Sequence, residues 1–552
     1  MQVCMGHRGA ARRDPAAYAL RQRGVLRRSI MAWIGLAGIG FSSPSTAFAQ
    51  WREATVGSEA ELYLRAMQSR GLFGGEPVSI RAYSPPVVDR WGRDSSALAA
   101  SAPSHPWSPR FHHDSARLWL LPATIMGSYN SAFAWGFNDG AAWQGRGVNT
   151  VATVGFGARW RWLSLRVAPM WFSAVNRPFT LTGDTTRGVN PFVDGQRPYN
   201  IDLPQRFGRA RYTRIDPGQS ELRADLGLFA AGLSTMNEFW GPGVRHSLLM
   251  GSNSAGFPHV FLGSSRAWRT PAGRVSGRVT YGKLSQSDQA PASPNRTRFG
   301  SGIIATWQPP SGKSFEFGLA RFYHREWPTG GVTMSDLKAP LGALFGDSQI
   351  TADNQLATLF MRWRAEDDGF ELFGEFGKND RNADTRDLIV EPEHNGAWLL
   401  GFLKTFRLSE RTLWMLRTEV VNGRVTELQR IGRGQSTFYD HAPITQGHTE
   451  RGQLLGSYLM ERANGFETSV DRWTRSGRAG FSVMYRATPT DLGDGVAKAT
   501  ARSQWYAEAN GVRFVGGQEL FAKAGVVFDL NRTPARDGYN THLSLGARLR
   551  QH

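Results

Sequence analysis

From about residue 115 onward, apolar and polar residues alternate with a period of two, and this pattern restricts the fold more than any other feature of the chain. Between residues 152 and 162 the odd positions hold Thr, Gly and Arg, and the even positions hold Ala152, Val154, Phe156, Ala158, Trp160 and Trp162. The alternation recurs within residues 370–376, 414–420, 478–486 and 542–550. Successive side chains of a β-strand point to opposite faces, so the pattern predicts strands that are apolar on one face only.

Two architectures satisfy this alternation: a large soluble β-sandwich or propeller, and a transmembrane β-barrel. The polar faces of the predicted strands carry many Arg and Glu residues, and Trp and Tyr residues lie near the strand ends. These features are typical of a barrel with an apolar outer surface in lipid and a charged lumen. We therefore predict that residues 111–552 form an all-β transmembrane barrel of about 16–20 antiparallel strands, at roughly 22–27 residues per strand with its connection.

The N-terminus has the pattern of a secretory leader. Arg27 and Arg28 precede an apolar run from Ile30 to Phe41, and Ala47-Phe48-Ala49 matches an A-x-A cleavage site. This run is shorter than the ~20 residues that a membrane-spanning helix needs. We predict that residues 1–49 are a signal peptide cleaved after Ala49. The only cysteine, Cys4, lies in this leader, so the predicted mature chain has neither disulfides nor thiolate metal ligands.

Residues 50–110 are predicted to form a small helical periplasmic segment and its linker. Ser58-Glu-Ala-Glu61 matches a capping box, apolar residues then follow on one helical face, and Gly71 is a natural stop. Residues 94–110 are rich in Ser, Ala and Pro, which indicates a connection. The helical segment could contribute a plug or cap, because a barrel this wide has a lumen that is either water-filled or plugged.

Composition and motifs exclude several functions. The formal net charge is +19, but the Arg residues are spread along the chain rather than clustered, which argues against a nucleic-acid partner. The chain contains no G-x-S-x-G or H-E-x-x-H motif. His112-His113-Asp114 could bind a metal, but its place at the linker–barrel junction favours solvated polar residues. We expect no catalytic residue, no cofactor and no metal.

Acidic residues near residue 380 leave hydrolysis open. Glu375, Asp380, Asp384 and Asp387 are close in sequence, and glycoside hydrolysis uses two carboxylates at a defined separation. Sequence spacing does not establish that separation. Acids in turns or ion pairs in the lumen are the alternative interpretation.

Three segments, at residues 138–147, 237–263 and 438–453, mix aromatic rings with Arg, Asn, Gln and His. Sugar recognition uses these residue types, because amides and guanidinium groups bond hydroxyls while rings cover C–H faces. The alternative is a hydrogen-bonded network that stiffens loops and lumen. With Glu375 and Asp380, the candidate polysaccharide or lumen contacts are Asn138, Asp139, Trp143, Gln144, Arg146, Asn237, Trp240, Asn253, His259, Tyr439, His441, Gln446, Arg451 and Gln453.

The middle segment is the most compact of the three. We expect Asn237–Gly243 to end one barrel strand, with its glycines and Pro242 permitting a tight turn. Val260–Leu262 then belongs to the next strand.

Several runs resemble the capsule assembly Wzi family of outer-membrane proteins. They are NDGAAWQGRGVN (138–149), NEFWGPG (237–243), FPHVFLGSSR (257–266), FELFGEFGKND (370–380) and FYDHAPITQGHTERGQLLG (438–456), and GSEAELYLRAMQSRGL (57–72) is similar to that family's N-terminus. The chain departs from the family where Ser457-Tyr-Leu-Met-Glu-Arg462 replaces a small Gly/Pro-containing run. It also ends on Arg550-Gln-His552 rather than on the aromatic residue usual for such barrels.

The resemblance implies a barrel of about eighteen strands with a small helical periplasmic segment. It further implies a non-catalytic protein of the bacterial outer membrane that binds capsular polysaccharide or exopolysaccharide and assists its assembly or attachment. The implied partners are that polymer, outer-membrane lipid and other polysaccharide export components. A porin-like or substrate-specific channel is the alternative function, and a carbohydrate-active barrel enzyme is a third.

Overall fold

The strands that form the wall of the barrel run antiparallel to their neighbours, and the last of them pairs with the first. The computed structural model describes residues 50–51, 54–71, 77–83, 86–88, 110–111, 118–182, 190–195, 199, 201–290, 297–310, 314–342, 353–379, 395–409, 412–424, 437–441, 443–488, 501–516, 518–533 and 536–549. All of them belong to one compact unit, residues 47–552. The predicted signal peptide, residues 1–49, and the 112–114 motif lie outside the described residues.

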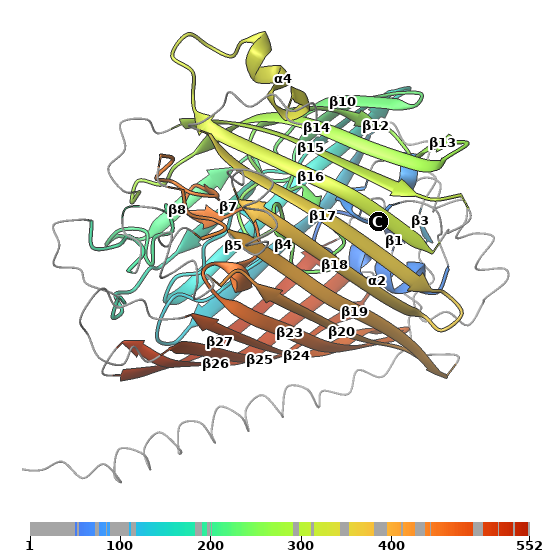
Figure 1. The fold of residues 1–552 in the computed structure, drawn as a ribbon. Helices are drawn as coiled ribbons and strands as arrows, with labels where there is room; N and C mark the ends of the chain where they lie inside the picture. The colour runs from blue at the N-terminus through green and yellow to red at the C-terminus, as the bar shows by residue number, and fades with distance from the viewer. Residues whose placement is uncertain are drawn as a thin grey trace, which may run out of the picture. The chain divides into compact units, whose positions relative to one another are not determined.

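The described strands form a closed barrel of 18 strands, in agreement with the predicted range (Figure 1). Three wall strands are interrupted and consist of two segments each, because both segments pair with the same neighbour. In chain order the wall consists of β4 (Leu118–Asn130), β5 (Gly147–Trp160), β6 with β7 (Leu163–Val167 and Met170–Ala174), β8 with β9 (Tyr212–Asp216 and Glu221–Leu226), β10 (Phe229–Ser234), β12 with β13 (His259–Ser264 and Trp268–Thr270), β14 (Gly273–Ser285), β15 (Thr297–Gln308), β16 (Phe315–Glu326), β17 (Asn354–Ala365), β18 (Phe370–Asn379), β19 (Gly396–Ser409), β20 (Thr412–Asn422), β23 (Asn464–Thr474), β24 (Gly477–Thr488), β25 (Arg502–Val515), β26 (Gln518–Thr533) and β27 (Arg536–Leu549).

The last strand pairs with the first, from His542 opposite Asn130 to Leu549 opposite Ala123. Among the described elements there are also three two-stranded pairs outside the wall: β1 (Gln50–Trp51) with β3 (Arg110–Phe111), β2 (Ile80–Arg81) with β11 (Phe239–Trp240), and β21 (Thr449–Glu450) with β22 (Gln453–Leu454). The helices are α2 (Glu59–Gln68), α4 (Met334–Gly342) and the 3₁₀ turn η2 (Tyr458–Met460). None of the helices in the described part is long and apolar enough to cross a membrane.

The two ends of the barrel differ. At one end the connections are tight, as at residues 161–162 and 475–476, and β4 begins and β27 ends there. At the other end residues 131–146, 175–211, 235–258 and 423–463 connect the strands. Outer-membrane barrels have short periplasmic turns and longer extracellular loops. The end with the long connections is therefore the extracellular end.

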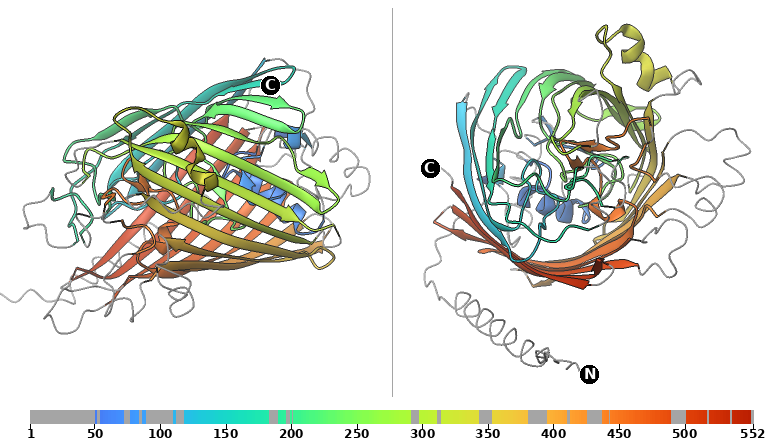
Figure 2. Two further views of the ribbon diagram at one scale, coloured as in Figure 1. Left: turned by 45° about the horizontal axis from the view of Figure 1, so that its top comes forward. Right: turned by 90° about the vertical axis from the view of Figure 1, so that its left-hand side faces the viewer.

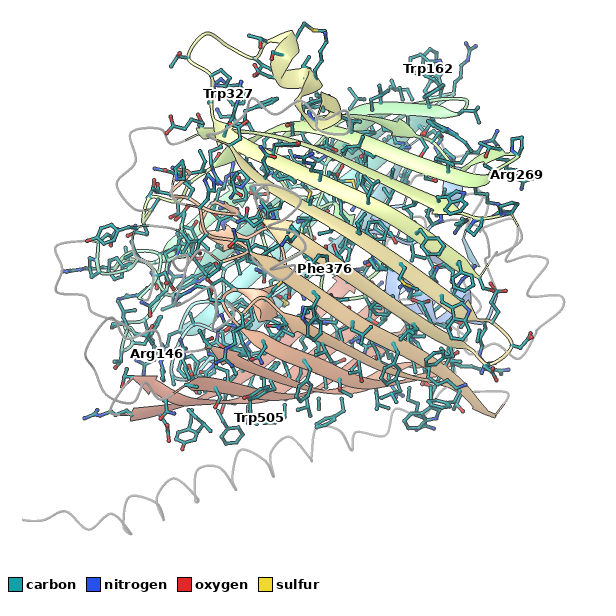
Figure 3. All side chains as sticks on the ribbon, in the orientation of Figure 1. Arg146, Trp162, Arg269, Trp327, Phe376 and Trp505 are labelled. Atoms are coloured by element: carbon teal, nitrogen blue, oxygen red, sulfur yellow. The ribbon has the colours of Figure 1, made fainter. Side chains whose placement is uncertain are left out.

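The alternation read from the sequence corresponds to an inside-out pattern of burial. On β18 the outward Leu372 and Phe376 are exposed, whereas the inward Glu371 and Glu375 are buried. On β5 the outward Val154 and Trp160 are 62% and 55% exposed. Figure 3 shows such outward side chains around the wall, with Trp505 pointing away from it. Burying an apolar face in lipid and a polar face in the lumen satisfies both, which confirms the predicted fold class.

The lumen contains the hydrophobic core. Helix α2 and parts of the long connections lie inside the ring of strands (Figure 2, right). Ser58 caps α2 by accepting a hydrogen bond from Glu61 N at 3.2 Å, as the capping-box pattern predicts. Tyr63, Leu64 and Met67 of α2 share one buried cluster with inward wall residues such as Phe322 and Phe373. We call the set formed by α2, β2 and residues 235–258 and 437–463 the plug.

One expectation about the wall was wrong. Asn237–Gly243 does not end a barrel strand, because β10 stops at Ser234 and the chain then turns into the lumen. There Phe239–Trp240 forms β11 and pairs with β2. Val260–Leu262 does lie in the next wall strand, β12. A run of buried apolar residues bounded by glycines has the same local signature whether it lines a wall or fills a lumen.

Buried ion pairs join the plug to the wall. Arg65 of α2 donates to Glu371 of β18, and the same carboxylate accepts from Arg362 of β17 at 2.6 Å. Glu316 of β16 accepts from the backbone N–H groups of Val78 and Ser79 at 3.3 and 3.2 Å. All three ionised side chains at Glu371 are almost fully buried.

Replacing Glu371 should loosen α2. In a Glu371→Ala variant Arg65 and Arg362 stay buried without their shared carboxylate, and breaking such a pair costs about 3–5 kcal/mol. We expect α2 to become cleavable by trypsin after Arg65, as measured by mass spectrometry of digests of the folded barrel. The matched control, Arg475→Ala at an exposed turn, should leave α2 protected. Equal protection in both variants would contradict this account of docking.

Candidate functional site

The W-G-P-G run at residues 240–243 joins the N-terminal part of the plug to the 235–258 connection. Arg65 Nη2 donates to Pro242 O at 2.6 Å, and Arg81 Nη2 donates to Gly243 O at 2.6 Å. Gly241 has φ +120°, and a Cβ there would lie 2.8 Å from the Glu375 carboxylate. This backbone conformation and the close approach both require glycine.

Acidic side chains of the wall bind the residues that follow this run. Glu419 of β20 accepts from Val244 N at 2.7 Å and Arg245 N at 3.0 Å. Glu375 accepts from Leu248 N at 3.3 Å. Backbone N–H groups that are buried away from water need acceptors, so these buried acids hold residues 244–248, which belong to no strand. Glu375, a candidate for hydrolysis or sugar contact, is therefore a structural acceptor here, and Asp380, Asp384 and Asp387 lie outside the described residues.

The other candidates in the middle segment are also tied into the structure. Trp240 is fully buried, and its Nε1 donates to Glu238 at 2.8 Å. Asn237 donates to Gly251 O and Ser254 O at 3.2 and 2.9 Å. His259 lies 3.1 Å from Glu238. Asn253 differs from these three because it lines a cavity.

In the 437–463 connection, too, some candidates are held in internal hydrogen bonds and others lie nearer to open space. Tyr439 is buried, and its hydroxyl donates to Leu248 O at 2.9 Å and accepts from Ser457 N at 2.8 Å. His441 accepts from Ile444 N, and burial lowers the pKa of His441 to about 4. Gln446 donates to Gln286 at 2.8 Å. These three stiffen the connection.

Arg451 and Gln453 lie closer to open space. Arg451 has φ +49° and pairs with Asp216 at 3.0 Å and with Glu450 at 3.2 Å. Gln453 lines the same cavity as Asn253, and its amide is within 3.4 Å of Asn253 O.

The first segment, residues 138–146, approaches this cavity from the other side. Gln144 donates to Asp139 at 2.6 Å, and burial raises the pKa of Asp139. Trp143 packs its half-exposed ring against Phe207, with ring centroids 5.1 Å apart. Asn138 donates its backbone N–H to Asn253, and Arg146 donates to Ser131 O. Trp143 and Gln144 line the cavity, whereas the other three residues support it.

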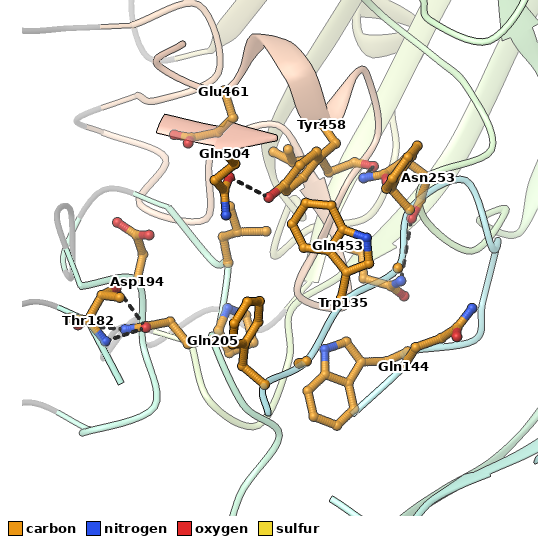
Figure 4. Close-up of a pocket in the computed structure, with 18 of the residues that line it drawn as sticks. Trp135, Gln144, Thr182, Asp194, Gln205, Asn253, Gln453, Tyr458, Glu461 and Gln504 are labelled. Atoms are coloured by element: carbon orange, nitrogen blue, oxygen red, sulfur yellow. Dashed lines mark hydrogen bonds between the residues drawn. The ribbon is translucent and has the colours of Figure 1, made fainter. Parts of the chain in front are cut away.

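This cavity, which we call the outer cavity, is the place where candidate residues from all three segments meet (Figure 4). Its volume is about 200 Å³, and its lining comes from the connections 131–146, 175–211, 235–258 and 423–463 and from the extracellular ends of β24, β25 and β26. Of the predicted contacts it brings together Trp143, Gln144, Asn253 and Gln453.

The outer cavity also contains residues that sequence reasoning missed. Three arginines project from the strand ends: Arg486, Arg502 and Arg532. Arg502 and Arg532 share one carboxylate, Asp529, at 2.6 and 2.8 Å. The alternation within residues 478–486 places Arg486 on the polar face of its strand, but nothing local showed that the three arginines converge.

Aromatic rings form the floor of the outer cavity. The rings of Tyr458 and Phe137 stack with centroids 5.8 Å apart, and Trp135 meets Tyr458 edge-on at 5.9 Å. Arg486 lies over the Tyr458 ring, 4.8 Å from its centroid. The Tyr458 hydroxyl donates to Gln504 at 3.0 Å. Tyr458 belongs to the 457–462 run, which the sequence singled out only as a departure from the family.

Within the described ranges, no group of three or more His, Cys, Asp or Glu side chains is placed to hold a metal ion. Near the arginines, burial raises the pKa of Glu461 to about 7, against the effect of Arg462 and Arg486. The donors that line the cavity are guanidinium and amide groups, which suit hydroxyl and carboxylate partners.

The fold and this site define a class of protein: an outer-membrane β-barrel whose lumen is filled by its own chain beneath an extracellular cavity. The family model described as capsule assembly protein Wzi matches residues 225–526, which is more than half of the chain. The chain belongs to this family and is a protein of the outer membrane.

The chain is similar to several solved structures. The chain is 12% identical to a protein described as Wzi, an outer-membrane protein involved in group 1 capsule assembly in Escherichia coli and a carbohydrate-binding β-barrel, with coverage of 90% of this chain and 98% of that chain and a TM-score of 0.59. Pseudomonas aeruginosa OccK1 (OpdK) is 10% identical, with 78% and 98% coverage and a TM-score of 0.38. Acinetobacter baumannii OccAB1 is 9% identical, with 78% and 95% coverage and a TM-score of 0.39. No curated protein matches the chain.

Replacing Trp240 should affect stability. A Trp240→Ala substitution leaves a cavity at the W-G-P-G run, and such core truncations cost about 3–5 kcal/mol. We expect a lower unfolding midpoint in detergent, measured by tryptophan fluorescence in urea. Trp505→Ala, which removes an outward ring, is the control and should shift the midpoint much less. A midpoint unchanged by Trp240→Ala would show that the plug does not contribute to global stability.

Stability should depend on pH through Glu450, which lies inside the lumen on β21. Burial raises the pKa of Glu450 to about 7, although it accepts a hydrogen bond from Ser285 N at 2.7 Å. Because the folded pKa lies above the ordinary value of 4.5, the stabilising contribution of protonated Glu450 is complete below about pH 4.5 and is lost as pH rises to about 7.

A Glu450→Gln variant retains the acceptor without the charge, so its thermal midpoint relative to wild type should rise between pH 5 and pH 8. The same difference at both pH values would contradict the assignment.

Proposed function

We propose that this protein binds capsular polysaccharide or exopolysaccharide in the outer cavity and retains the polymer at the cell surface without cleaving it. The observation that carries the proposal is the convergence of partly exposed aromatic rings with guanidinium and amide groups at the extracellular end of a plugged barrel. Each part of that observation matches one requirement of sugar binding.

The rings supply flat apolar surface. Trp143, Phe137 and Tyr458 are each partly exposed in or beside the cavity. The C–H faces of a pyranose ring are apolar, so an aromatic face can cover them and bury area at a low entropic cost. Tyr458 is already held by stacking and by its bond to Gln504, so little conformational freedom is lost on binding.

The polar groups can orient a bound sugar through hydrogen bonds. Gln144, Gln453 and Gln504 each present an amide that can both donate and accept, as a hydroxyl does. Arg502 and Arg532 divide one carboxylate between them, so each guanidinium has further N–H donors for a ligand. Arginine's planar donors match the geometry of carboxylates and can also donate to sugar hydroxyls.

The position of the cavity fits retention at the surface. Four long connections enclose it, and these lie at the extracellular end of the barrel. Beneath it the plug fills the lumen with a hydrophobic core. A polymer that enters the outer cavity therefore meets a floor. Membership of the capsule assembly family, together with the description of Escherichia coli Wzi as a carbohydrate-binding barrel, supports the same function.

Binding should depend on the rings that line the cavity. We expect detergent-solubilised protein to bind polymer purified from the surface of the organism that carries it, and Tyr458→Ala and Trp143→Ala to weaken binding about tenfold each, equivalent to about 1.4 kcal/mol. Surface plasmon resonance with immobilised protein measures the effect. Trp505→Ala serves as the control because it removes a ring of comparable exposure from the lipid-facing side of the same strand region.

Absence of binding by the wild-type protein, or equal loss in all three variants, would sink the proposal. Shortened polymer after prolonged incubation would show instead that the barrel is an enzyme.

A further inference from the structure

A second cavity, the inner cavity, lies toward the periplasmic end of the lumen. Its volume is about 210 Å³, and it is bounded by the start of α2, by residues 244–252 and by the inward faces of β23–β27. Charged groups of both signs line it, among them Arg478, Glu508, Glu519, Lys523 and Arg548. The proposed polysaccharide function makes no use of it.

The two cavities follow one another along the same strands. On β25, Gln504 lines the outer cavity and Glu508 lines the inner one, which are four residues or about 13 Å apart along the strand. On β24, Arg486 lines the outer cavity and Ser482 the inner one. Phe137 lines both.

A single layer of side chains separates the cavities. The inward residues that fall between the two linings are Tyr506 on β25 and Met484 on β24, which are 3% and 1% exposed. The Tyr506 ring packs against Phe137 at 6.2 Å and against Trp135 at 5.4 Å between centroids. We call Trp135, Phe137, Met484 and Tyr506 the septum.

We propose that the outer and inner cavities are two halves of one passage for small polar solutes, namely ions and single sugar units, which the septum holds closed. The septum is one layer thick along each strand, and on both sides of it the walls are charged or polar. Walls that carry both signs of charge give little preference for cations or anions. The cavity volumes, about 200 and 210 Å³, suit the passage of small solutes, whereas a polymer that binds in the outer cavity does not pass through.

The apolar side chains of the septum explain why it closes the passage. Wall charges elsewhere in the lumen form ion pairs with the plug. The side chains of the septum are held by ring packing and by a hydrogen bond from the Tyr506 hydroxyl to Glu508. An apolar layer across a narrow polar path excludes water and ions without blocking the path covalently. Removing ring volume from this layer should therefore join the cavities.

Conductance in planar bilayers tests the passage directly. We expect wild-type protein to show no steady current and a Phe137→Ala, Tyr506→Ala double variant to show a stable conductance at least severalfold above that baseline. Phe322→Ala is the matched control, because it removes a buried lumen ring that lines neither cavity, and it should remain closed. The single Phe137→Ala variant, with a smaller rise, covers the case in which the double variant does not fold, as judged by heat-modifiable migration.

A current in the wild-type protein equal to that of the double variant would overturn the proposal, because the septum would then close nothing. A double variant that folds and stays closed, or a control that opens equally, would overturn it as well.

Cysteine labelling provides a second readout that does not depend on current. The sole native cysteine is Cys4, so introduced cysteines can be followed against the parent chain. A small maleimide that cannot cross lipid, added to intact cells, should label Ala134→Cys in the outer cavity and spare Ser482→Cys in the inner one. Adding Phe137→Ala should make Ser482→Cys reactive. Labelling of Ser482→Cys with Phe137 intact, or protection without it, would count against a closed passage at this layer.

Discussion

Carboxylates on the inner wall of the barrel determine the rest of this structure. Glu316, Glu371, Glu375 and Glu419 lie on three wall strands, β16, β18 and β20, face the lumen and are almost completely buried. A polar or ionised group in that position is costly unless it is hydrogen-bonded. The chain satisfies these groups with its own arginines and backbone N–H groups, and each bond to an ionised carboxylate contributes about 1.5–3 kcal/mol. The plug is therefore the partner that the wall requires, and the outer cavity is the space that remains above it.

The W-G-P-G run and the residues that follow it form hydrogen bonds both with the N-terminal segment and with the wall. Its carbonyls accept from Arg65 and Arg81 of the N-terminal segment, and the residues that follow it donate to Glu419. The glycines and the tryptophan made the run stand out in the sequence. In the structure Gly241 permits the close approach to Glu375, and Trp240 is buried in the lumen. The connection that carries the run also supplies Asn253 to the outer cavity, so the fastening of the plug and the shape of the cavity are linked.

The wall could be predicted from the sequence, and the interior of the lumen could not. Period-two alternation reports which face of a strand a residue occupies, and Leu372, Phe376, Glu371 and Glu375 all lie on the predicted faces. It does not report what covers the inward face. Asn237–Gly243 was therefore assigned to the wall, although it crosses the lumen and pairs with β2.

The candidate site shows the same limit. Residue type marked Trp143, Gln144, Asn253 and Gln453 as suited to sugars, and the structure brings these four together. The same criterion also marked Trp240, Tyr439 and His259, which are buried in hydrogen bonds, because aromatic and amide groups serve equally well in a buried network. Arg486, Arg502 and Arg532 were missed because their convergence depends on the register of three strands and on connections far apart in sequence.

The most direct test of the central claim is the partition of polymer between cells and medium. The organism that carries this chain would be compared with a strain lacking it, complemented either with the wild-type chain or with the Tyr458→Ala, Trp143→Ala double variant. The account predicts unchanged total polymer, release of most of it into the medium on deletion, and restored cell association with the wild-type chain but not with the double variant. Polymer that stays on the cells after deletion would contradict it.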